Sequence, residues 1–370
     1  MPATAPIPGL TWYSFLHAAP LRPLHTWVRT AEARFRPARF RPFAPRLEAA
    51  RERLRREGGV AGAGGATILR EAGRGRVPTI VLGGFVPDST EQVFLLRRVF
   101  LAAGDLYCFN YPRDSFSLDL LCAQLDDLVA ELGAAGQPPV LFGVSFGAGL
   151  ILEWLRRARG AGRAPVLAGL VLVSPVACVA DVLAPEAAKP ATLLGRAVKP
   201  YLAAETAITE ASVERSRTIF TRMFEAGAQN KLALRRLMTR PELEQLRGAV
   251  MGTIRGITAD GARQRMRAMT AMRSPTDYFV PAALPLTTAP TLVLFAEREE
   301  AVMDPQAPSL FAFRHACQAY FPAGHVREVA ARPGDAPVQH ASLIFHVFEF
   351  LPPLQAFYTR VRHLPLPLAA

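Results

Sequence analysis

The sequence predicts an α/β protein with a mostly parallel central sheet and helices on both faces. Short segments that are apolar throughout alternate along the chain with longer segments of amphipathic helical pattern. A strand that is apolar throughout is typical of a parallel sheet that helices cover on both faces. The chain has 370 residues, 50% of them hydrophobic, which is enough for one large core with additions. The clearest apolar segments are "PTIVLGG" (78–84), "PPVLFGV" (138–144) and "VLAGLVLVSP" (166–175).

The first half of the core is predicted to follow a Gly/Ala linker, "GGVAGAGGA" (58–66). Two further segments, "TILREAG" (67–73) and "DLYCFNYP" (105–112), have the composition of strands. The segment "STEQVFLLRRVFLAAG" (89–104) is predicted as one helix that ends at its last glycine. Two more helices are expected between the apolar strands, because apolar residues recur there at spacings of three and four. These helices cover residues 117–136 and 146–162.

The second half of the core is predicted to start with "APTLVLFAEREEAVMDP" (289–305), a strand and the loop after it. A helix over 305–320 and a last strand over 325–331 follow. The predicted organisation is an N-terminal basic extension and linker (1–65), the first part of the core (66–180), a helical cap insertion (181–285), the second part of the core (286–356) and a C-terminal tail (357–370).

The insertion over 181–285 is too long for a loop and is rich in helical pattern. A helical cap at this place favours a hydrophobic acyl substrate and the exclusion of water. Its methionines have two interpretations: ordinary core residues, or the roof of a flexible apolar pocket. They are Met223, Met238, Met251, Met266, Met269 and Met272.

The formal net charge is +12, and more than half of it lies in residues 21–60, which hold eleven arginines and four glutamates. Aromatic residues interleave with the arginines there, as in "RFRPARFRPF" (34–43). The favoured interpretation is an extension that packs on the domain with solvated arginines. A second one is peripheral contact with an anionic membrane surface, and nucleic-acid binding ranks third.

The cysteine spacing, the longest apolar segment and the N-terminus argue against a metal-binding, a membrane-spanning and a secreted protein. The four cysteines lie far apart, without the spacing of a metal site, so we expect buried thiols in a reducing compartment and neither metal nor cofactor. The segment 168–185 contains Pro175 and Asp181 and indicates a buried strand and loop rather than a membrane span. The N-terminus has no pattern of a secretory signal. We therefore expect a cytoplasmic protein, either free or peripheral to the inner face of a membrane.

The sequence Gly143-Val144-Ser145-Phe146-Gly147 joins a predicted buried strand to a predicted helix. A serine at such a tight turn has strained backbone angles, and glycines two residues away on either side let the chain pass closely. The hydroxyl then stands at the sheet edge, near the amide groups of the helix N-terminus. This arrangement suits attack on a carbonyl, where the developing negative charge needs hydrogen-bond donors already in place.

With these flanks the chain resembles the α/β-hydrolase superfamily, in particular its serine esterases and lipases, over residues 66–180 and about 286–352. The resemblance implies Ser145 as the nucleophile and Gly143 and Gly147 as parts of its turn. The segment "LGGF" (82–85) matches the position of the family's early oxyanion loop. The implied oxyanion donors are therefore the backbone amides of Phe85 and Phe146.

The resemblance also requires an acid and then a histidine further along the chain. Glu299 aligns with the acid that follows the strand in 289–305, where aspartate is more usual. The other acidic residues that compete for this role are Glu297, Glu300, Asp304 and, after the preceding strand, Asp181.

Two histidines compete for the base. His340 lies in "RPGDAPVQH", a loop that follows the last predicted strand, where the family places its base. His325 lies in "FPAGHVREVAA" (321–331), and its Gly-His pair matches a common family signature. With His325 as the base, no strand would fit between the preceding helix and this residue. The order of strands therefore favours His340.

These residues predict a serine hydrolase that cleaves a carboxylic ester or thioester of a hydrophobic acyl group through a Ser-His-acid triad and an acyl-enzyme. Two alternatives remain open: an acyltransferase with the same triad, and a non-catalytic binding protein on the same fold. The expected partner is a small-molecule substrate, and the sequence leaves the oligomeric state undetermined.

Overall fold

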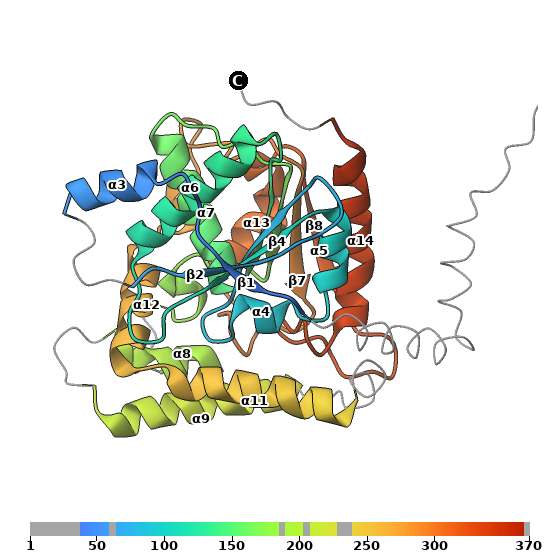
Figure 1. Cartoon of the computed structure of the whole chain (residues 1–370). Coiled ribbons are helices and arrows are strands. Elements are labelled where there is room, and N and C mark those ends of the chain that lie inside the picture. Colours follow the sequence, from blue (N-terminus) through green and yellow to red (C-terminus); the bar gives the residue numbers. More distant parts are fainter. Residues whose placement is uncertain (1–37, 59–63, 185–188, 203–207, 228–238, 366–370) are drawn as a thin grey trace, which may run out of the picture.

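The structure is a computed structural model that describes residues 38–58, 64–184, 189–202, 208–227 and 239–365. Its centre is an eight-stranded sheet in the order β1-β2-β4-β3-β5-β6-β7-β8 (Figure 1). Strands β3 to β8 are parallel, while β1 and β2 are antiparallel to their neighbours. The predicted mostly parallel sheet is confirmed. The strands are β1 (Arg41–Phe43), β2 (Thr67–Glu71), β3 (Thr79–Leu82), β4 (Leu106–Asn110), β5 (Val140–Val144), β6 (Gly169–Val173), β7 (Thr291–Ala296) and β8 (Gly324–Val329).

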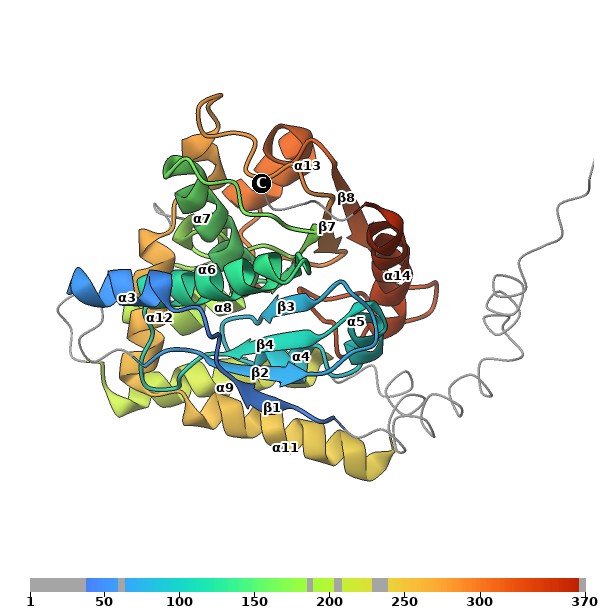
Figure 2. The same cartoon turned by 45° about the horizontal axis from the view of Figure 1, so that its top comes forward.

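Helices cover both faces of this sheet. On one face α5 (Arg97–Ala103) lies beside α14 (Val347–His363), as Figures 1 and 2 show. The helices of the other face are α6 (Leu118–Ala134), α7 (Phe146–Gly160) and α13 (Pro308–Tyr320). Every residue of β3, β5, β6 and β7 is buried, and these strands are apolar apart from the threonines that begin β3 and β7.

The single helix expected over 89–104 is divided in the structure. A short helix, α4 (Ser89–Gln92), is followed by a turn over 93–96 and then by α5. The turn buries Val93 and Leu96 completely. The turn also brings Arg97 of α5 to 2.6 Å from Glu71 of β2. Each of these two buried charges thus has a partner of opposite sign.

Part of the predicted N-terminal extension joins the fold. Strand β1 adds an edge to the sheet, and α3 (Ala49–Arg56) packs on α6. The carboxylate of Asp127 on α6 accepts hydrogen bonds from the Ala50 amide (2.8 Å) and from Arg51 Nε (2.7 Å). The remainder of the Arg-rich arm, residues 1–37, lies outside the described residues, and so does the membrane contact suggested for it.

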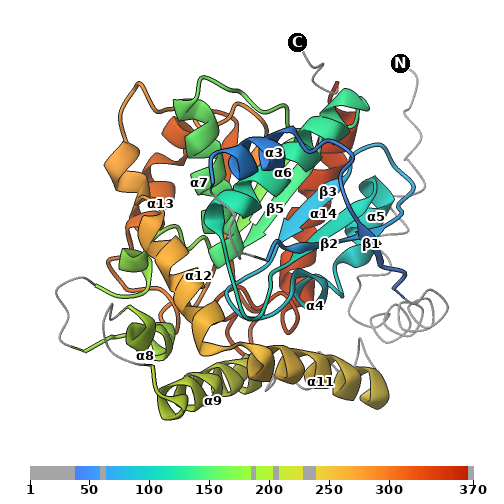
Figure 3. The ribbon, with the colours of Figure 1, turned by 60° about the vertical axis from the view of Figure 1, so that its left-hand side comes forward.

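The long segment between β6 and β7 forms several helices at one end of the sheet (Figure 3). We call the described parts of residues 189–278 the helical insertion. Helices α9 and α11 lie side by side, and α11 also contacts α4 at the end of the sheet. The helices are α8 (Leu193–Val198), α9 (Glu210–Gly227), α11 (Arg240–Gly256) and α12 (Ala259–Ala271), with two short 3-10 turns, η3 (Lys199–Tyr201) and η4 (Pro275–Tyr278).

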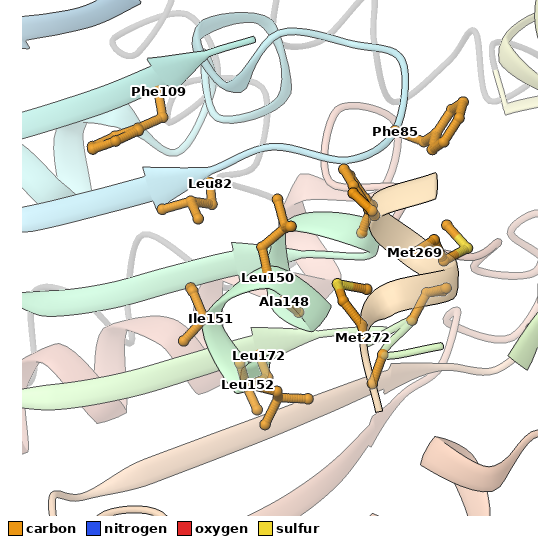
Figure 4. Close-up of a cluster of buried hydrophobic side chains, with 14 of the residues drawn as sticks. Leu82, Phe85, Phe109, Ala148, Leu150, Ile151, Leu152, Leu172, Met269 and Met272 are labelled. Carbon is orange, nitrogen blue, oxygen red and sulfur yellow. The ribbon is translucent and has the colours of Figure 1, made fainter. Parts of the chain in front are cut away.

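The helical insertion shares a hydrophobic core with the sheet. Figure 4 shows Leu82 of β3, Ala148 of α7 and Met269 of α12 in one cluster of buried side chains. The buried methionines of the insertion are Met266, Met269 and Met272. Met223 and Met251 are partly buried against the same cluster, and Met238 lies outside the described residues. Because the cluster is continuous, burial of apolar surface holds the insertion on the core.

The four cysteines are unpaired and buried: Cys108, Cys122, Cys178 and Cys317. Burial raises the pKa of the Cys317 thiol to about 11, and it raises the pKa of the other three as well. Among the described residues, no helix is both long and apolar enough to cross a membrane. In the same part of the chain, no three His, Cys, Asp or Glu side chains are grouped as metal ligands.

Candidate active site

Ser145 lies at the turn between β5 and α7, and its backbone φ of 52° and ψ of −115° place it in a strained region. The turn is so tight that its neighbours must be glycine. A Cβ on Gly143 would lie 2.5 Å from Ala148 Cα, and one on Gly147 would lie 2.2 Å from the Leu82 oxygen. The strained turn places Ser145 at the end of β5, where α7 begins.

His340 follows β8 and contacts Ser145 directly. His340 Nε2 lies 2.8 Å from Ser145 Oγ, and His340 Nδ1 makes a very short contact with Glu299 Oε2. The side chains of His340 and Glu299 are each only 6% exposed. The structure thus brings Ser145, His340 and Glu299 into one hydrogen-bonded chain. Since the carboxylate holds Nδ1–H, Nε2 presents its lone pair to the serine hydroxyl.

Glu299 lies in the loop after β7, and its second oxygen is fully engaged. Glu299 Oε1 accepts hydrogen bonds from Ser174 Oγ (2.8 Å) and from the Ala296 amide (2.6 Å). The loops that carry the acid and the histidine are joined directly, because the Arg298 amide donates to the Val338 carbonyl at 3.0 Å. Ser174, directly after β6, was not singled out in the sequence. The sequence signal that could have identified Ser174 is its position directly after a predicted parallel strand, because functional side chains gather at the carboxyl ends of such strands.

The other acidic candidates lie away from His340 or have other partners. Glu300 is exposed and pairs with Arg298 at 3.4 Å, and the Ala331 amide donates to Glu297 at 3.0 Å. Asp304 Oδ1 accepts from the Gln306 amide at 2.9 Å. Asp181 is fully buried and accepts from the amide and the hydroxyl of Ser309, at 2.8 and 2.7 Å.

The alternative histidine lies in a different part of the molecule. His325 is the second residue of the edge strand β8, its side chain is exposed, and its Nε2 lies 3.3 Å from Arg360 on α14. Within the described part of the chain, His325 makes no hydrogen bond to Ser145 or Glu299, and both of these side chains contact His340 instead. A base at this position would therefore have no path to the serine hydroxyl.

Phe85 and Phe146, the two residues expected to supply oxyanion donors, both lie close to Ser145 in the chain or in space. Phe146 is the first residue of α7, where backbone amides have no intrahelical acceptor. Phe85 follows Gly84, where an added Cβ would lie 3.7 Å from Ser145 Cβ, so this loop passes close to the serine. The two phenyl rings pack edge to face at 5.5 Å. Phe85 and Phe146 thus belong to two different segments of the chain that meet next to Ser145.

A cavity of about 170 Å³ opens at Ser145 and His340. Its wall on the side of the sheet includes Gly84 and Phe85. The helical insertion contributes six apolar side chains to its lining: Leu194, Phe220, Met223, Phe224, Val250 and Ile254. Of the described residues that line the cavity, His340 alone has a side chain that is ionisable near neutral pH. The cavity thus fits an uncharged, apolar group next to the Ser145 hydroxyl and the His340 imidazole.

Solved structures with the same fold include three bacterial proteins. MenH from S. aureus matches with a TM-score of 0.53 at 15% identity, covering 80% of this chain and 99% of that one. A thermophilic esterase from Thermogutta terrifontis matches with a TM-score of 0.52 at 17% identity, over 82% and 97% of the two chains. The esterase RhEst1 from Rhodococcus sp. ECU1013 matches with a TM-score of 0.50 at 15% identity, over 80% and 96%.

At such low identity these similarities establish the fold alone, and the chain has the α/β-hydrolase fold. No protein-family model matches the sequence, and a search of the curated proteins finds no match.

Proposed function

We propose that this chain with the α/β-hydrolase fold is a serine hydrolase that cleaves a carboxylic ester or thioester of a hydrophobic acyl group. The proposal is supported above all by one observation: Ser145 Oγ lies 2.8 Å from His340 Nε2, whose other nitrogen contacts Glu299, at the mouth of an apolar cavity. Structural neighbours that are esterases agree with this class of reaction.

In the proposed mechanism Ser145 attacks the carbonyl carbon of the substrate and transfers its proton to His340 Nε2. Glu299 holds the imidazole ring in place and stabilises the imidazolium that forms. The negative charge on the carbonyl oxygen is held by the amides of Phe85 and Phe146. His340 then returns the proton to the leaving group, and an acyl group stays on Ser145. His340 then takes a proton from water as the water oxygen attacks the acyl carbon, the bond from this carbon to Ser145 Oγ breaks, and His340 returns the proton to Oγ, which releases the acid.

The proposed substrate class is supported by the lining of the cavity. Six apolar side chains of the helical insertion line the cavity that opens at Ser145, and they suit an acyl chain rather than a charged group. We propose that the helical insertion acts as a cap. An apolar chain in this cavity would displace water from the site, which strengthens the electrostatic contacts to the oxyanion.

Three further statements remain predictions from the sequence. They are the division of the chain into an extension, a two-part core and a cap, the cytoplasmic location, and the contact of the Arg-rich arm with a membrane. Flotation of the full chain with anionic vesicles tests the last of these, because an electrostatic contact weakens as salt is added.

The mechanism is tested with a fluorophosphonate probe, which labels an activated serine. We expect labelling of the wild type, no labelling of Ser145→Ala, and loss of more than about 100-fold in rate for His340→Ala. His325→Ala is the matched control and is expected to label at the wild-type rate. Labelling that survives in Ser145→Ala would contradict the mechanism.

The reaction class is tested by product analysis. Aryl esters of increasing acyl length are hydrolysed with and without added alcohols or thiols as acceptors. Free acid as the main product supports a hydrolase, and acylated acceptor as the main product identifies an acyltransferase. Labelling of Ser145 without turnover of any ester or thioester would instead favour a binding protein.

A further inference from the structure

The loop after β3, which carries the Phe85 amide, is held by side chains from three different elements. The Tyr111 hydroxyl donates to the Gly83 carbonyl at 3.0 Å. The Gly84 amide donates to Gln92 Oε1 of α4 at 2.8 Å. The carbonyl of Phe85 itself accepts a very short hydrogen bond from Arg265. Side chains therefore hold the Gly83–Gly84 and Phe85–Val86 peptide groups, which lie on either side of the peptide group that carries the Phe85 amide.

Arg265 belongs to α12 of the helical insertion, and its side chain is completely buried. Its second guanidinium nitrogen donates to the Pro112 carbonyl at 2.8 Å, in the loop after β4. The guanidinium group also lies 5.9 Å from the centre of the Phe85 ring and 5.6 Å from that of Tyr111. One arginine thus joins the insertion to two separate loops at the carboxyl edge of the sheet.

The buried charge is costly. The charged groups that act on Arg265 are Arg113 and Asp88, and Asp88 is already paired with Arg113 at 2.6 Å. Burial, together with the nearby charge of Arg113, lowers the pKa of Arg265 to about 10, so the guanidinium stays charged at neutral pH. An apolar side chain would hold α12 on the core at lower cost. What an apolar side chain cannot do is orient two backbone carbonyls through a planar fork of donors.

We propose that Arg265 is a positioning residue for the oxyanion site, so that the Phe85 amide is correctly aimed only while the helical insertion is docked on the core. This inference rests on the proposed function. Its physical basis is that the Phe85 carbonyl and the Phe85 amide belong to peptide groups joined at one α-carbon. A rotation of one peptide group, once its hydrogen bond is lost, moves the other.

The arrangement links substrate binding to catalysis. Phe85 contacts the insertion through its side chain as well, because its ring stacks on Phe220 of α9 at 6.1 Å. An acyl chain that packs against Phe220 and its neighbours keeps the insertion in place, and Arg265 then keeps the oxyanion donor in place. The contribution of Arg265 is made to the transition state and hardly to the bound substrate, so its loss is expected in kcat rather than in KM.

Gln264 supplies a matched control on the same helix. Gln264 Oε1 accepts a hydrogen bond from the Phe116 amide at 2.7 Å, and thus also joins the insertion to the core. Unlike Arg265, it makes no contact with Phe85 among the described residues. Gln264→Leu therefore removes one docking contact and leaves the oxyanion loop untouched.

The test compares wild type, Arg265→Met, Arg265→Lys and Gln264→Leu. An aryl ester reports kcat and KM, and a trifluoromethyl ketone of the same acyl length reports the affinity for the tetrahedral adduct. For Arg265→Met we expect kcat to fall about 10- to 100-fold, KM to stay within about threefold, and the affinity for the ketone to fall in parallel with kcat. Arg265→Lys, which keeps the charge but loses the fork, is expected to lose less. Gln264→Leu is expected to keep kcat within about twofold.

Thermal unfolding shows which variants fold. If Arg265→Met does not fold, kcat and the ketone affinity are compared between wild type and Arg265→Lys. The inference is overturned if kcat and ketone affinity stay within twofold of wild type in the folded Arg265 variants. It is also overturned if Gln264→Leu loses as much as they do, since the contact would then act only by docking. A wild type that neither turns over esters nor labels at Ser145 would refute the proposed function together with this inference. If the wild type is active, the proposed function stands, and the Arg265 variants test this inference alone.

Discussion

Ser174 Oγ donates a hydrogen bond of 2.8 Å to Glu299 Oε1, the oxygen of this carboxylate that does not face His340. Ser174 is fully buried and also accepts a hydrogen bond of 3.2 Å from the Ala341 amide. One hydroxyl therefore connects the end of β6, the loop after β7 and the residue next to His340. Because the contact fixes the second carboxylate oxygen, it determines the direction in which Glu299 faces the imidazole.

Removal of this hydroxyl is expected to reduce activity more than stability. For Ser174→Ala we predict that kcat falls about 10- to 150-fold while KM stays nearly constant, because a hydrogen bond to a charged group contributes about 1.5 to 3 kcal/mol. Steady-state kinetics on an aryl ester measure the effect. Ser216→Ala is the control, since Ser216 is a buried serine of α9 that bonds the Ala197 carbonyl, remote from the triad. Equal losses of kcat in both variants would show a general effect on folding.

His346 is predicted to make stability depend on pH. Burial lowers its pKa below the ordinary value of 6.5, while its Nε2 lies 3.1 Å from the Ala336 carbonyl. Below about pH 6.5 the unfolded chain therefore binds a proton that the folded chain resists. The stabilisation is fully present above this pH and is lost as the pH falls toward the folded-state pKa.

Denaturant unfolding at pH 5 to 8 measures this effect. In His346→Gln we expect a weaker decline of the free energy of unfolding between pH 6.5 and 5 than in the wild type. His315→Gln, on α13, serves as the control and should keep the wild-type slope. A His346→Gln protein with the same slope as wild type would exclude this residue as the source.

The cavity is predicted to set the acyl length that is accepted. Met223 of α9 lines the cavity and is only partly buried, so Met223→Trp can fill space there without displacing the core. We expect kcat/KM for the longest ester accepted to fall about tenfold and that for an acetate ester to stay within about twofold. Met251→Trp, which packs on the same cluster outside the cavity lining, should leave the length preference unchanged. A uniform loss over all chain lengths would contradict this role of Met223.

Two glycines are predicted to respond to alanine with opposite signs. Gly248 is an exposed interior residue of α11, with no atom within 4 Å of an added Cβ. Gly248→Ala should therefore raise the free energy of unfolding by about 0.5 to 1 kcal/mol. At Gly147 the added Cβ would lie 2.2 Å from the Leu82 oxygen, and we expect a loss of about 2 kcal/mol or more. Chemical denaturation of both variants gives the two values, and a stable Gly147→Ala protein would argue against so tight a turn.

Several features could be predicted because they depend on local composition. Strands such as β5 and β6 are buried along their whole length, so their apolar character alone distinguishes them from the helices. The turn at Ser145 was predictable because its steric demands restrict the flanking residues to glycine. The position of His340 followed from counting strands. By contrast, β1 and α3 are short and polar, and they are defined by their pairing with β2 and α6 rather than by a pattern of their own.

The chain by itself determined the alternation of buried strands and amphipathic helices, and the order in which a serine, an acid and a histidine follow strand ends. Periodicity and turn chemistry are properties of a few neighbouring residues. Only the tertiary structure decided which carboxylate faces His340, that Ser174 holds this carboxylate, and that Arg265 reaches the Phe85 carbonyl from 180 residues away. Such contacts join polar groups that are far apart in the chain, and they form only because burial of apolar surface has first brought their strands and helices together.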